Sequence, residues 1–248
     1  MILHRASSDL AEAAALLTRL PVPDHAPRGA ATAWAWPVVG ALIGAVLGAV
    51  GWATQGAGLP AGVTAALLLG TQAMLTGALH EDGLSDTADG LYGGRDRARR
   101  LEIMKDSRVG SYGVLALILV TLVRWSALST LVGTGALLPA LIAAGALSRA
   151  PMAAVMAALP NARGTGLSHA TGRPNRRTAA LAAGLALALS LVLTGPTGLA
   201  LAVGAALAAA WVALTARARI GGQTGDILGA TQQLAEAAVL TLAATLLI

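Results

Sequence analysis

Three long stretches with almost no charged residues decide what this 248-residue chain can fold into. Residues 29–79 and 178–216 contain no Asp, Glu, Lys or Arg, and residues 109–160 contain only Arg124 and Arg149. A soluble domain alternates apolar and polar residues, whereas uncharged runs of this length fit helices embedded in lipid. The runs are also too long and too evenly apolar for the strands of a membrane barrel. The sequence therefore predicts an all-α, polytopic bundle of membrane helices.

About seven spans are expected within one membrane-embedded domain that covers residues 1–248. Their predicted bounds are Pro37–Ala53, Leu59–Leu79, Tyr112–Val132, Ala136–Leu159, Ala179–Gly195, Thr197–Ala216 and Ile227–Ile248. The first and fifth are short, which leaves open whether both cross completely. Residues 9–20 have the apolar spacing of a helix but contain charged side chains, so we expect an interfacial helix there.

The connections between the spans differ sharply in charge. Residues 54–58, residues 133–135 and the turn around Pro196 carry no charge, whereas 15 of the 17 basic residues lie in the segments at the other helix ends. Positive residues are enriched on the cytoplasmic side of membrane proteins. We therefore expect the charged segments to face the cytoplasm, as in a multi-pass protein of the cytoplasmic (inner) membrane.

The composition narrows the range of partners. The net charge of +5 comes from these basic segments and favours anionic lipid headgroups and phosphorylated solutes. Only 3% of the residues are aromatic, which leaves too few platforms for base stacking, so we do not expect nucleic acid as a partner. The absence of cysteine excludes disulfides and thiolate chemistry.

Acidic residues crowd the segment HEDGLSDTADGLYGG (80–94), directly after an apolar run. Asp82, Asp86 and Asp89 are spaced to share one stripe of a helix, where like charges repel one another. Three aligned carboxylates favour a bound hard cation such as magnesium, manganese or calcium. The alternative is a solvated acidic loop. His80 is predicted to point to the opposite side of the helix and is not counted as a ligand.

Further polar residues are expected at the same membrane face. The segment KDSRVGSYG (105–113) offers Lys105, Arg108, two serines and glycine N–H groups, which together suit phosphate oxygens. The segment IGGQTGDILGA (220–230) places Asp226 behind glycines, as a fourth carboxylate beside a backbone bent close to a ligand. Metal-bound carboxylates beside basic residues indicate a metal-dependent phosphotransferase, without indicating its substrate.

Charged residues inside the predicted spans need a partner or an interior site. For Arg124 we expect structural pairing. Arg149 has two interpretations: it contacts an anionic substrate, or it pairs with an acidic neighbour such as Glu236.

The segments HEDGLSDTADGLYGG, LEIMKDSRVGSYG and IGGQTGDILGA together resemble the cobalamin synthase family, the adenosylcobinamide-GDP ribazoletransferases. Shorter similarities, such as LLTRLPVP (16–23) and LSRAPMAAVMAALPNARGTGL (147–167), extend the resemblance along the chain. One departure is Glu81, where members of the family often have an apolar residue.

The resemblance implies a reaction, a cofactor and roles for individual residues. The 3′-hydroxyl of α-ribazole, or of its 5′-phosphate, attacks adenosylcobinamide-GDP and releases GMP, and magnesium is required. The implied metal ligands are Asp82, Asp86, Asp89 and Asp226. The implied phosphate-binding residues are Lys105, Arg108, Arg149 and Arg163. Asp106 and Asp89 compete for the role of general base.

Two other functions remain open at this stage. A CDP-alcohol type lipid phosphotransferase would share the metal chemistry but use a cytidine nucleotide and a lipid alcohol. A transporter would use Arg124, Arg149 and Glu236 as part of a permeation path. The sequence leaves the oligomeric state open.

Overall fold

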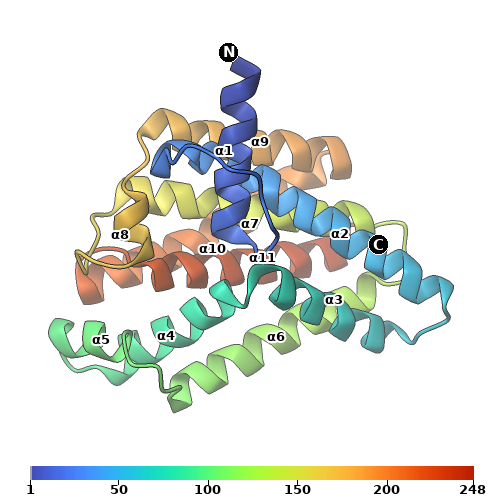
Figure 1. Ribbon diagram of the computed structural model, residues 1–248. Helices are drawn as coiled ribbons and strands as arrows, with labels where there is room; N and C mark the ends of the chain where they lie inside the picture. Colours follow the sequence, from blue (N-terminus) through green and yellow to red (C-terminus); the bar gives the residue numbers. More distant parts are fainter. Residues whose placement is uncertain (1) are drawn as a thin grey trace.

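The computed structural model describes residues 2–248 and consists of helices joined by short connections (Figure 1). The elements in chain order are α1 (Ile2–Leu17), the 3₁₀ helix η1 (Gly29–Ala35), α2 (Trp36–Gly56), α3 (Ala61–Thr76), α4 (Leu79–Gly93), α5 (Arg97–Ile103), α6 (Ser111–Leu131), α7 (Leu137–Ala158), α8 (Leu167–Thr171), α9 (Arg176–Thr194), α10 (Thr197–Ile220) and α11 (Gly225–Leu246). Residues 2–248 contain no strand, only an isolated bridge between Asn161 and Gln223. The predicted all-α class is confirmed.

Within residues 2–248, six helices are long and apolar enough to cross a membrane, and the number is seven if the bent pair α3 and α4 is one span. The two spans that were predicted to be short are longer in the structure. Helix α2 has 21 residues and extends the first predicted span at both ends, and α9 has 19 residues and begins before the fifth predicted span. Because successive spans run in opposite directions, the α2–α3, α6–α7 and α9–α10 connections lie at one end of the bundle (Figure 1). These are the connections without charge.

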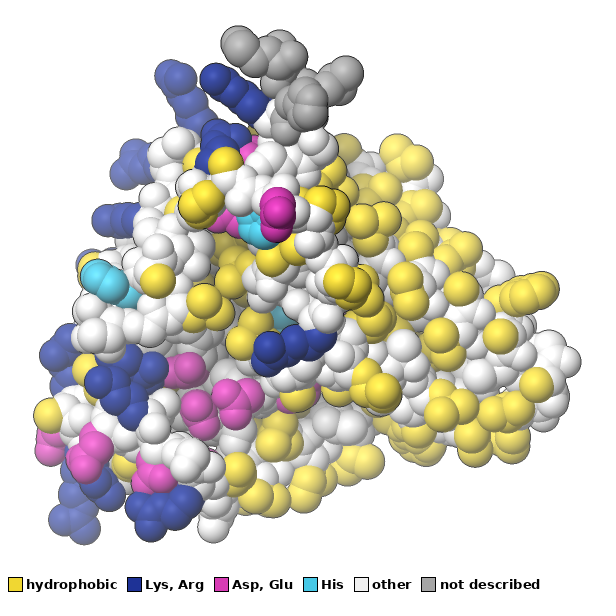
Figure 2. Space-filling view, in the orientation of Figure 1, with side chains coloured by type: hydrophobic (Ala, Val, Ile, Leu, Met, Phe, Trp, Pro, Cys, Tyr) yellow, Lys and Arg dark blue, Asp and Glu magenta, His cyan; other side chains and the backbone are white. Residues whose placement is uncertain are grey.

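The two ends of the molecule differ in their surface. Figure 2 shows apolar side chains covering one end, on the right of the view, and Lys and Arg side chains gathered at the other. The exposed apolar side chains include Leu119, Leu122, Leu207 and Leu214, in the middle of α6 and α10. An apolar belt of this kind suits contact with lipid. The predicted segregation of charge to one end is therefore present in the fold.

A sharp bend interrupts the chain at the end of the predicted second span. The chain turns by 91° between α3 and α4, and the two residues at the bend, Gly77 and Ala78, have φ angles of 62° and 55°. A left-handed conformation ends a helix readily at glycine but is uncommon for alanine. The continuous span predicted for Leu59–Leu79 therefore ends at Thr76, and the acidic segment begins a separate helix.

Glycines allow α2 and α7 to approach closely. Gly40 faces the backbone of Gly145, and Gly44 faces the backbone of Leu141 and Ile142, where a Cβ atom on either glycine would overlap with main-chain atoms. Small residues at four-residue spacing permit such close helix contacts in membranes. The spacing of Gly40, Gly44 and Gly48 therefore serves helix packing.

The amphipathic helix α1 crosses the other helices near the boundary between the charged and apolar ends (Figures 1 and 2). Its carboxylates hold it to the start of the bundle. Asp9 pairs with Arg28 at 2.5 Å and accepts a hydrogen bond from Trp34 Nε1 at 2.8 Å. Glu12 accepts the N–H groups of Arg28 and Gly29, both at 2.7 Å. Acidic groups at a helix N-terminus are stabilising, so Glu12 also anchors η1.

Candidate functional site

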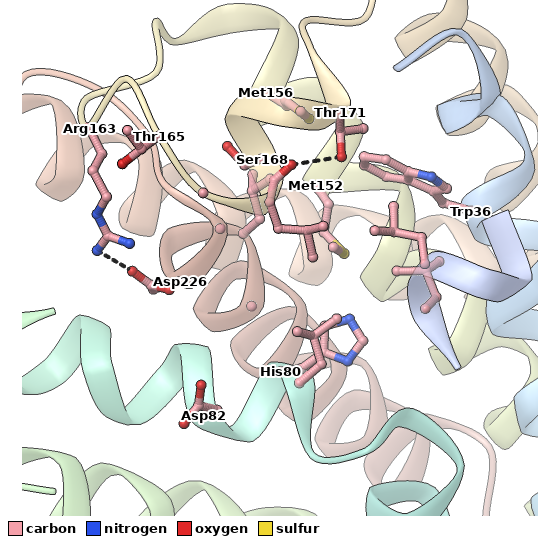
Figure 3. A pocket seen from close by; sticks show the side chains of 18 residues that line it. Trp36, His80, Asp82, Met152, Met156, Arg163, Thr165, Ser168, Thr171 and Asp226 are labelled. Carbon is pink, nitrogen blue, oxygen red and sulfur yellow. Dashed lines mark hydrogen bonds and ion pairs between the residues drawn. The ribbon is translucent and has the colours of Figure 1, made fainter. Parts of the chain in front are cut away.

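A pocket opens on the charged half of the molecule, between α1, α2, α4, α7, α8 and α11 (Figure 3). Its empty volume is about 710 Å³, including the solvent at its mouth. The lining is apolar on one side and charged on the other. The residues that line it are Leu16, Leu17, Trp36, Leu79, His80, Asp82, Met152, Met156, Arg163, Thr165, Gly166, Leu167, Ser168, Thr171, Gly225, Asp226, Leu228 and Gly229.

The acidic side of this pocket depends on the close crossing of α4 and α11. A Cβ atom on Gly83 would lie 2.9 Å from the carbonyl oxygen of Asp226, and one on Gly229 would lie 3.1 Å from the Cα atom of Gly83. Both distances are too short for an ordinary contact, so the two helices can touch only because both positions are glycine. This crossing places Asp82 of α4 beside Asp226 at the start of α11.

Asp226 is held by a basic residue from another part of the chain. Arg163 Nη2 donates to Asp226 Oδ2 at 2.7 Å and to the carbonyl oxygen of Met104 at 3.2 Å. Thr224 caps α11 by accepting the N–H of Ile227 at 3.3 Å, and its hydroxyl also donates to Asp226 at 3.2 Å. The first turn of a helix is a favourable place for a carboxylate. Arg163 and Asp226 were both predicted as site residues, and both line the pocket.

Gly221 and Gly222 in the turn before α11 contact the chain itself, whereas Gly225 lines the pocket, where the close approach of a ligand stays a prediction. Gln223 N–H donates to the carbonyl oxygen of Pro160, and Ala162 N–H donates to that of Gln223, both at 2.8 Å. Gly222 has no room for a Cβ atom because the Pro160 carbonyl lies there, and Gly221 has a φ angle of 76°. The turn therefore positions Arg163 by fixing the segment that carries it.

Three of the four predicted metal ligands repel the fourth. Asp86 lies close enough to Asp82, Asp226 and Asp89 for electrostatic repulsion from each, and Arg163 is the opposing positive charge. In this conformation, however, no three His, Asp or Glu side chains among residues 5–248 converge on a common point that could hold an ion. Hard oxygen donors suit magnesium. The donor set fits that metal, and its binding by three of these carboxylates requires the side chains to rearrange.

Asp89 is engaged by the backbone. It is 8% exposed, and its two carboxylate oxygens accept the N–H groups of Gly110 at 2.7 Å and Gly113 at 2.9 Å. The glycine N–H groups that were predicted to surround phosphate are thus bound to Asp89. This side chain ties α4 to the start of α6 and is absent from the pocket lining. Asp89 therefore has a structural contact with α6, and its roles as metal ligand and base stay predictions.

Asp106 and Arg108 pair with each other at the surface. Arg108 Nη2 donates to Asp106 Oδ2 at 2.6 Å, and Arg108 Nε donates to both carboxylate oxygens at 3.1 Å. These hydrogen bonds lower the pKa of Asp106 to about 2, so this carboxylate is a poor proton acceptor. Neither residue, nor the exposed Lys105, lines the pocket. Lys105 follows Met104, whose carbonyl contacts Arg163, so this segment lies at the rim of the site.

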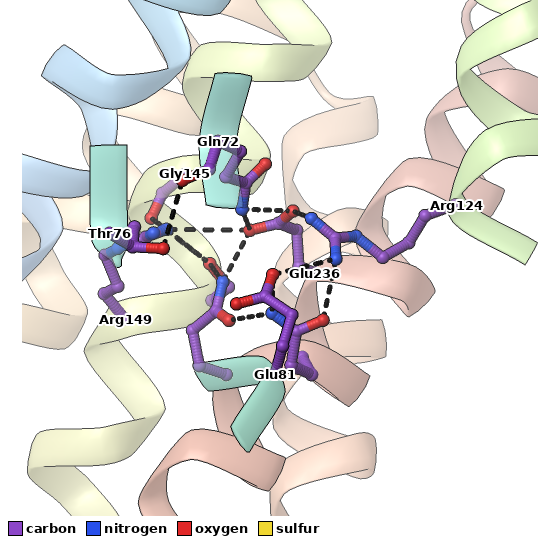
Figure 4. Close-up of polar contacts among 10 residues, drawn as sticks. Gln72, Thr76, Glu81, Arg124, Gly145, Arg149 and Glu236 are labelled. Atoms are coloured by element: carbon purple, nitrogen blue, oxygen red, sulfur yellow. Dashed lines mark hydrogen bonds and ion pairs between the residues drawn. The ribbon is translucent and has the colours of Figure 1, made fainter. Parts of the chain in front are cut away.

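Arg149 is buried in a polar network inside the bundle, away from the pocket (Figure 4). It is fully buried, and its Nη1 lies 3.1 Å from the carbonyl oxygen of Gly145 and 3.6 Å from Glu236 Oε2. Of the two interpretations of Arg149, pairing with Glu236 is therefore confirmed. Arg149 is absent from the lining of the pocket, and its contact with substrate stays a prediction.

The rest of this network balances its charge. Arg124 pairs with Glu236 at 2.6 Å and lies 3.5 Å from Glu81. Glu236 also accepts hydrogen bonds from Gln72 at 2.8 Å, and Glu81 accepts one from Gln233 at 3.0 Å. Two arginines face two glutamates, so the interior cluster has no net formal charge. The predicted structural pairing of Arg124 is confirmed, and Glu81 faces this network instead of the aspartates.

His80 is the main pocket residue that the sequence missed. The imidazole lines the pocket, is 1% exposed and has no hydrogen-bond partner at either nitrogen. Helical spacing predicted that His80 points away from Asp86. The bend at Gly77 and Ala78 then rotates the start of α4 towards α2 and α7. The left-handed alanine that causes this rotation has no sequence signature. Trp36 and Ser168, also in the lining, were missed because neighbours in the fold, not in the sequence, bring them there.

Comparisons with known proteins agree with this arrangement. A family model described as cobalamin-5-phosphate synthase matches residues 9–244. A protein of Mesorhizobium japonicum named adenosylcobinamide-GDP ribazoletransferase is 48% identical over 244 residues, which cover 96% of this chain and 93% of that protein. One of the same name from Bradyrhizobium diazoefficiens is 45% identical over 242 residues, with the same coverage of both chains. No solved structure matches the chain.

Proposed function

The chain belongs to the cobalamin-5-phosphate synthase family, and on that premise we propose that it joins α-ribazole, or α-ribazole 5′-phosphate, to adenosylcobinamide-GDP. The 3′-hydroxyl of the ribazole attacks the phosphorus atom attached to the aminopropanol arm. The bond from that phosphorus to the bridging oxygen breaks, GMP leaves, and adenosylcobalamin or its 5′-phosphate forms. The observation that carries the proposal is the family match over residues 9–244, which includes every residue of the pocket.

The charged side of the pocket suits this reaction. The reacting hydroxyl must lose a proton, and the carboxylates in the lining are Asp82 and Asp226, either of which can accept it when it does not hold the metal. The phosphate oxygens need positive charge, which Arg163 provides as a fork-shaped donor. Lys105 at the rim adds a second cation for the departing GMP. Arg149, Asp89 and Asp106 have no direct part in this scheme.

Magnesium is the metal that this donor set suits. We assign it to Asp82, Asp86 and Asp226, since these three carboxylates repel one another with only Arg163 to balance them. A bound magnesium ion would neutralise phosphate charge during the transfer. We assign Asp89 a weaker claim to the metal, because each of its oxygens already accepts one backbone N–H, from Gly110 or Gly113.

The test is a reconstitution with purified protein in detergent. Incubation with adenosylcobinamide-GDP, α-ribazole and magnesium should release GMP and form a product that contains both substrates. Omission of α-ribazole should abolish GMP release, and so should removal of magnesium with a chelator. Transfer from a cytidine nucleotide to a lipid alcohol, with no GMP in the first assay, would show a different phosphotransferase.

We place the charged end on the cytoplasmic side of the inner membrane. The chain has no cysteine, so single cysteines can be introduced without background labelling. Cysteines at Ser107, on the charged end, and at Ala57, in an uncharged connection, should react with an impermeant reagent from opposite sides, with Ser107 accessible only from the cytoplasm. Labelling of both positions from one side would contradict the topology.

A further inference from the structure

The imidazole of His80 is an unsatisfied polar group facing a pocket. Whichever tautomer it adopts, a neutral imidazole offers one N–H donor and one acceptor, and here neither has a partner. Buried polar side-chain atoms are bonded in the large majority of cases. His80 is 1% exposed, so bulk water does not reach it freely. Its environment is therefore incomplete until a molecule in the pocket provides the missing hydrogen bonds.

The backbone fixes the direction of this side chain. A Cβ atom on Gly229 of α11 would lie 3.2 Å from the carbonyl oxygen of His80 and 3.3 Å from its Cα atom. The α11 backbone thus packs directly on one side of His80. The side chain extends towards Trp36 and Met152, while Arg163 and Asp226 lie at the other side of the pocket (Figure 3). His80 is thereby held at the border between the apolar and the charged lining.

The apolar half of the pocket selects a particular kind of ligand. Its walls are Trp36, Met152, Met156 and Leu228, with Leu16 and Leu17 from α1. A tryptophan offers a flat surface for stacking, and methionines adapt to the outline of an apolar group. This half has His80 as its one titratable side chain. The buried polar atoms without a partner in this half are the two imidazole nitrogens of His80 and Nε1 of Trp36. It suits a flat, mainly apolar ring system with few polar atoms.

We infer that this half of the pocket binds the bicyclic base of α-ribazole and that His80 donates an N–H to the free ring nitrogen of that base. The inference rests on the proposed function and adds the orientation of one substrate. The base has two methyl groups and one free nitrogen acceptor, which match methionine and leucine walls with one imidazole. With the base in this half, the ribose points to Asp82 and Asp226, where its 3′-hydroxyl reacts.

The other parts of the two substrates fit this half less well. Guanine has donors and acceptors along its edge, and most of them would face leucine and methionine without a partner, which is unfavourable. The corrinoid carries many polar amide side chains, which would likewise lack partners among these apolar walls. The charged half, with Arg163, is instead the side for the phosphates.

The experiment combines a variant with a substrate analogue. His80→Leu should raise the KM for α-ribazole about tenfold or more, the effect of one lost hydrogen bond, and leave the KM for adenosylcobinamide-GDP unchanged. An analogue in which a C–H group replaces the free ring nitrogen should bind wild-type protein about tenfold more weakly. The His80→Leu variant should bind this analogue as tightly as it binds α-ribazole, because the variant has already lost the hydrogen bond that the analogue lacks.

Two controls separate binding from folding. His169→Leu makes the same change at an exposed histidine outside the pocket lining and should have no effect on either KM. His80→Gln keeps an N–H donor and should restore part of the affinity. If His80→Leu does not fold, His80→Gln and the analogue, measured by calorimetry with α-ribazole alone, still test the contact.

The possible outcomes have distinct meanings. A change in the KM for adenosylcobinamide-GDP alone would place the other substrate in this pocket and overturn the inference. Equal losses from the analogue in wild-type protein and His80→Leu would show that His80 does not contact the ring nitrogen, and would also overturn it. Wild-type protein that releases no GMP would refute the proposed function itself, whatever the binding of α-ribazole shows.

Discussion

Arg163 and Asp226 form an ion pair at 2.7 Å although 63 residues separate them in sequence. The same guanidinium contacts the carbonyl oxygen of Met104, at the end of α5. One side chain therefore joins three segments: the loop after α7, the start of α11 and the segment that leads to Lys105. This arrangement puts a positive charge beside the acidic cluster in the pocket without exposing it widely to solvent, since the Arg163 side chain is 12% exposed.

Replacement of Arg163 should affect catalysis more than folding. Arg163→Ala removes the fork-shaped donor that we assign to phosphate, and we expect kcat/KM to fall by about 100-fold or more. Arg163→Lys should recover only part of this loss, because a point charge does not reproduce a bidentate contact. Arg173→Ala, which removes a surface arginine bound to the carbonyl oxygen of Ala157, is the matched control. Similar kinetics for the Arg163 and Arg173 variants would contradict the assignment.

Substitutions of the four aspartates should differ in their effects on activity and on the response to magnesium. Asp82→Asn, Asp86→Asn and Asp226→Asn each remove a negative charge from the cluster, so activity should fall by about 100-fold or more. Higher magnesium should recover part of it for the weaker ligands. Magnesium should stabilise wild-type protein in thermal melts and stabilise these variants less. Equal stabilisation of wild-type protein and Asp86→Asn would remove Asp86 from the ligand set.

Asp89→Asn is the matched control for that series. The amide can accept only one of the two N–H groups from Gly110 and Gly113, so we expect a loss of about 1–3 kcal/mol in the free energy of unfolding. The stabilisation of the folded variant by magnesium should equal that of wild-type protein. A weaker response to magnesium would return Asp89 to the ligand set.

Asp106→Asn tests the predicted base directly. The hydrogen bonds from Arg108 lower the pKa of Asp106 to about 2, below the ordinary range of aspartate. A depressed pKa means that the pairing stabilises the protein above the unfolded pKa and is lost only as pH falls towards about 2. Asp106 therefore stays ionised at every pH at which the enzyme would be assayed. The pH–rate profiles of Asp106→Asn and wild-type protein should coincide, and the loss of an acidic limb would restore Asp106 as the base.

The buried network should govern stability. Arg149→Met leaves Glu236 with one arginine fewer, and loss of one partner from a buried ion pair costs about 3–5 kcal/mol. The thermal midpoint should fall, while the KM values of the folded fraction stay unchanged. Arg149→Met with Glu236→Gln should lose less than the sum of the single changes, because neither charge is left alone. A raised KM at unchanged stability would return Arg149 to the substrate.

Patterns that act over one helix were readable from the sequence. Long uncharged runs indicated the spans, and the bias of arginines predicted the charged end. Asp82, Arg163 and Asp226 were also identified before any geometry was available. These three side chains lie close together because Gly83 and Gly229 allow α4 and α11 to cross, and because backbone hydrogen bonds join the segments of Pro160 and Gln223. These long-range contacts have no local signature.

The partners of three other predicted site residues also depend on packing that the sequence does not show. Asp89 shares a helical stripe with Asp82 and Asp86, yet α6 begins beside it and takes both of its oxygens. The charge of Arg149 suggested a substrate, but helix packing sealed it inside the bundle. Asp106 gained an immediate neighbour, Arg108, that satisfies it. In each case the residue type indicated that a charged partner was needed, and the packing of the helices determined which group became that partner.

Helix α1 contributes Leu16 and Leu17 to the pocket while its axis crosses the spans near the polar–apolar boundary. An amphipathic helix at that level takes its depth from the packing and charge of the surrounding lipids. Through α1, the bilayer thus affects one wall of the site that we assign to α-ribazole. We expect the KM for α-ribazole to change between detergent micelles and bilayers rich in anionic lipid, even when the protein is equally folded in both. The lipid environment then acts as a variable of the enzyme's kinetics, alongside its two substrates.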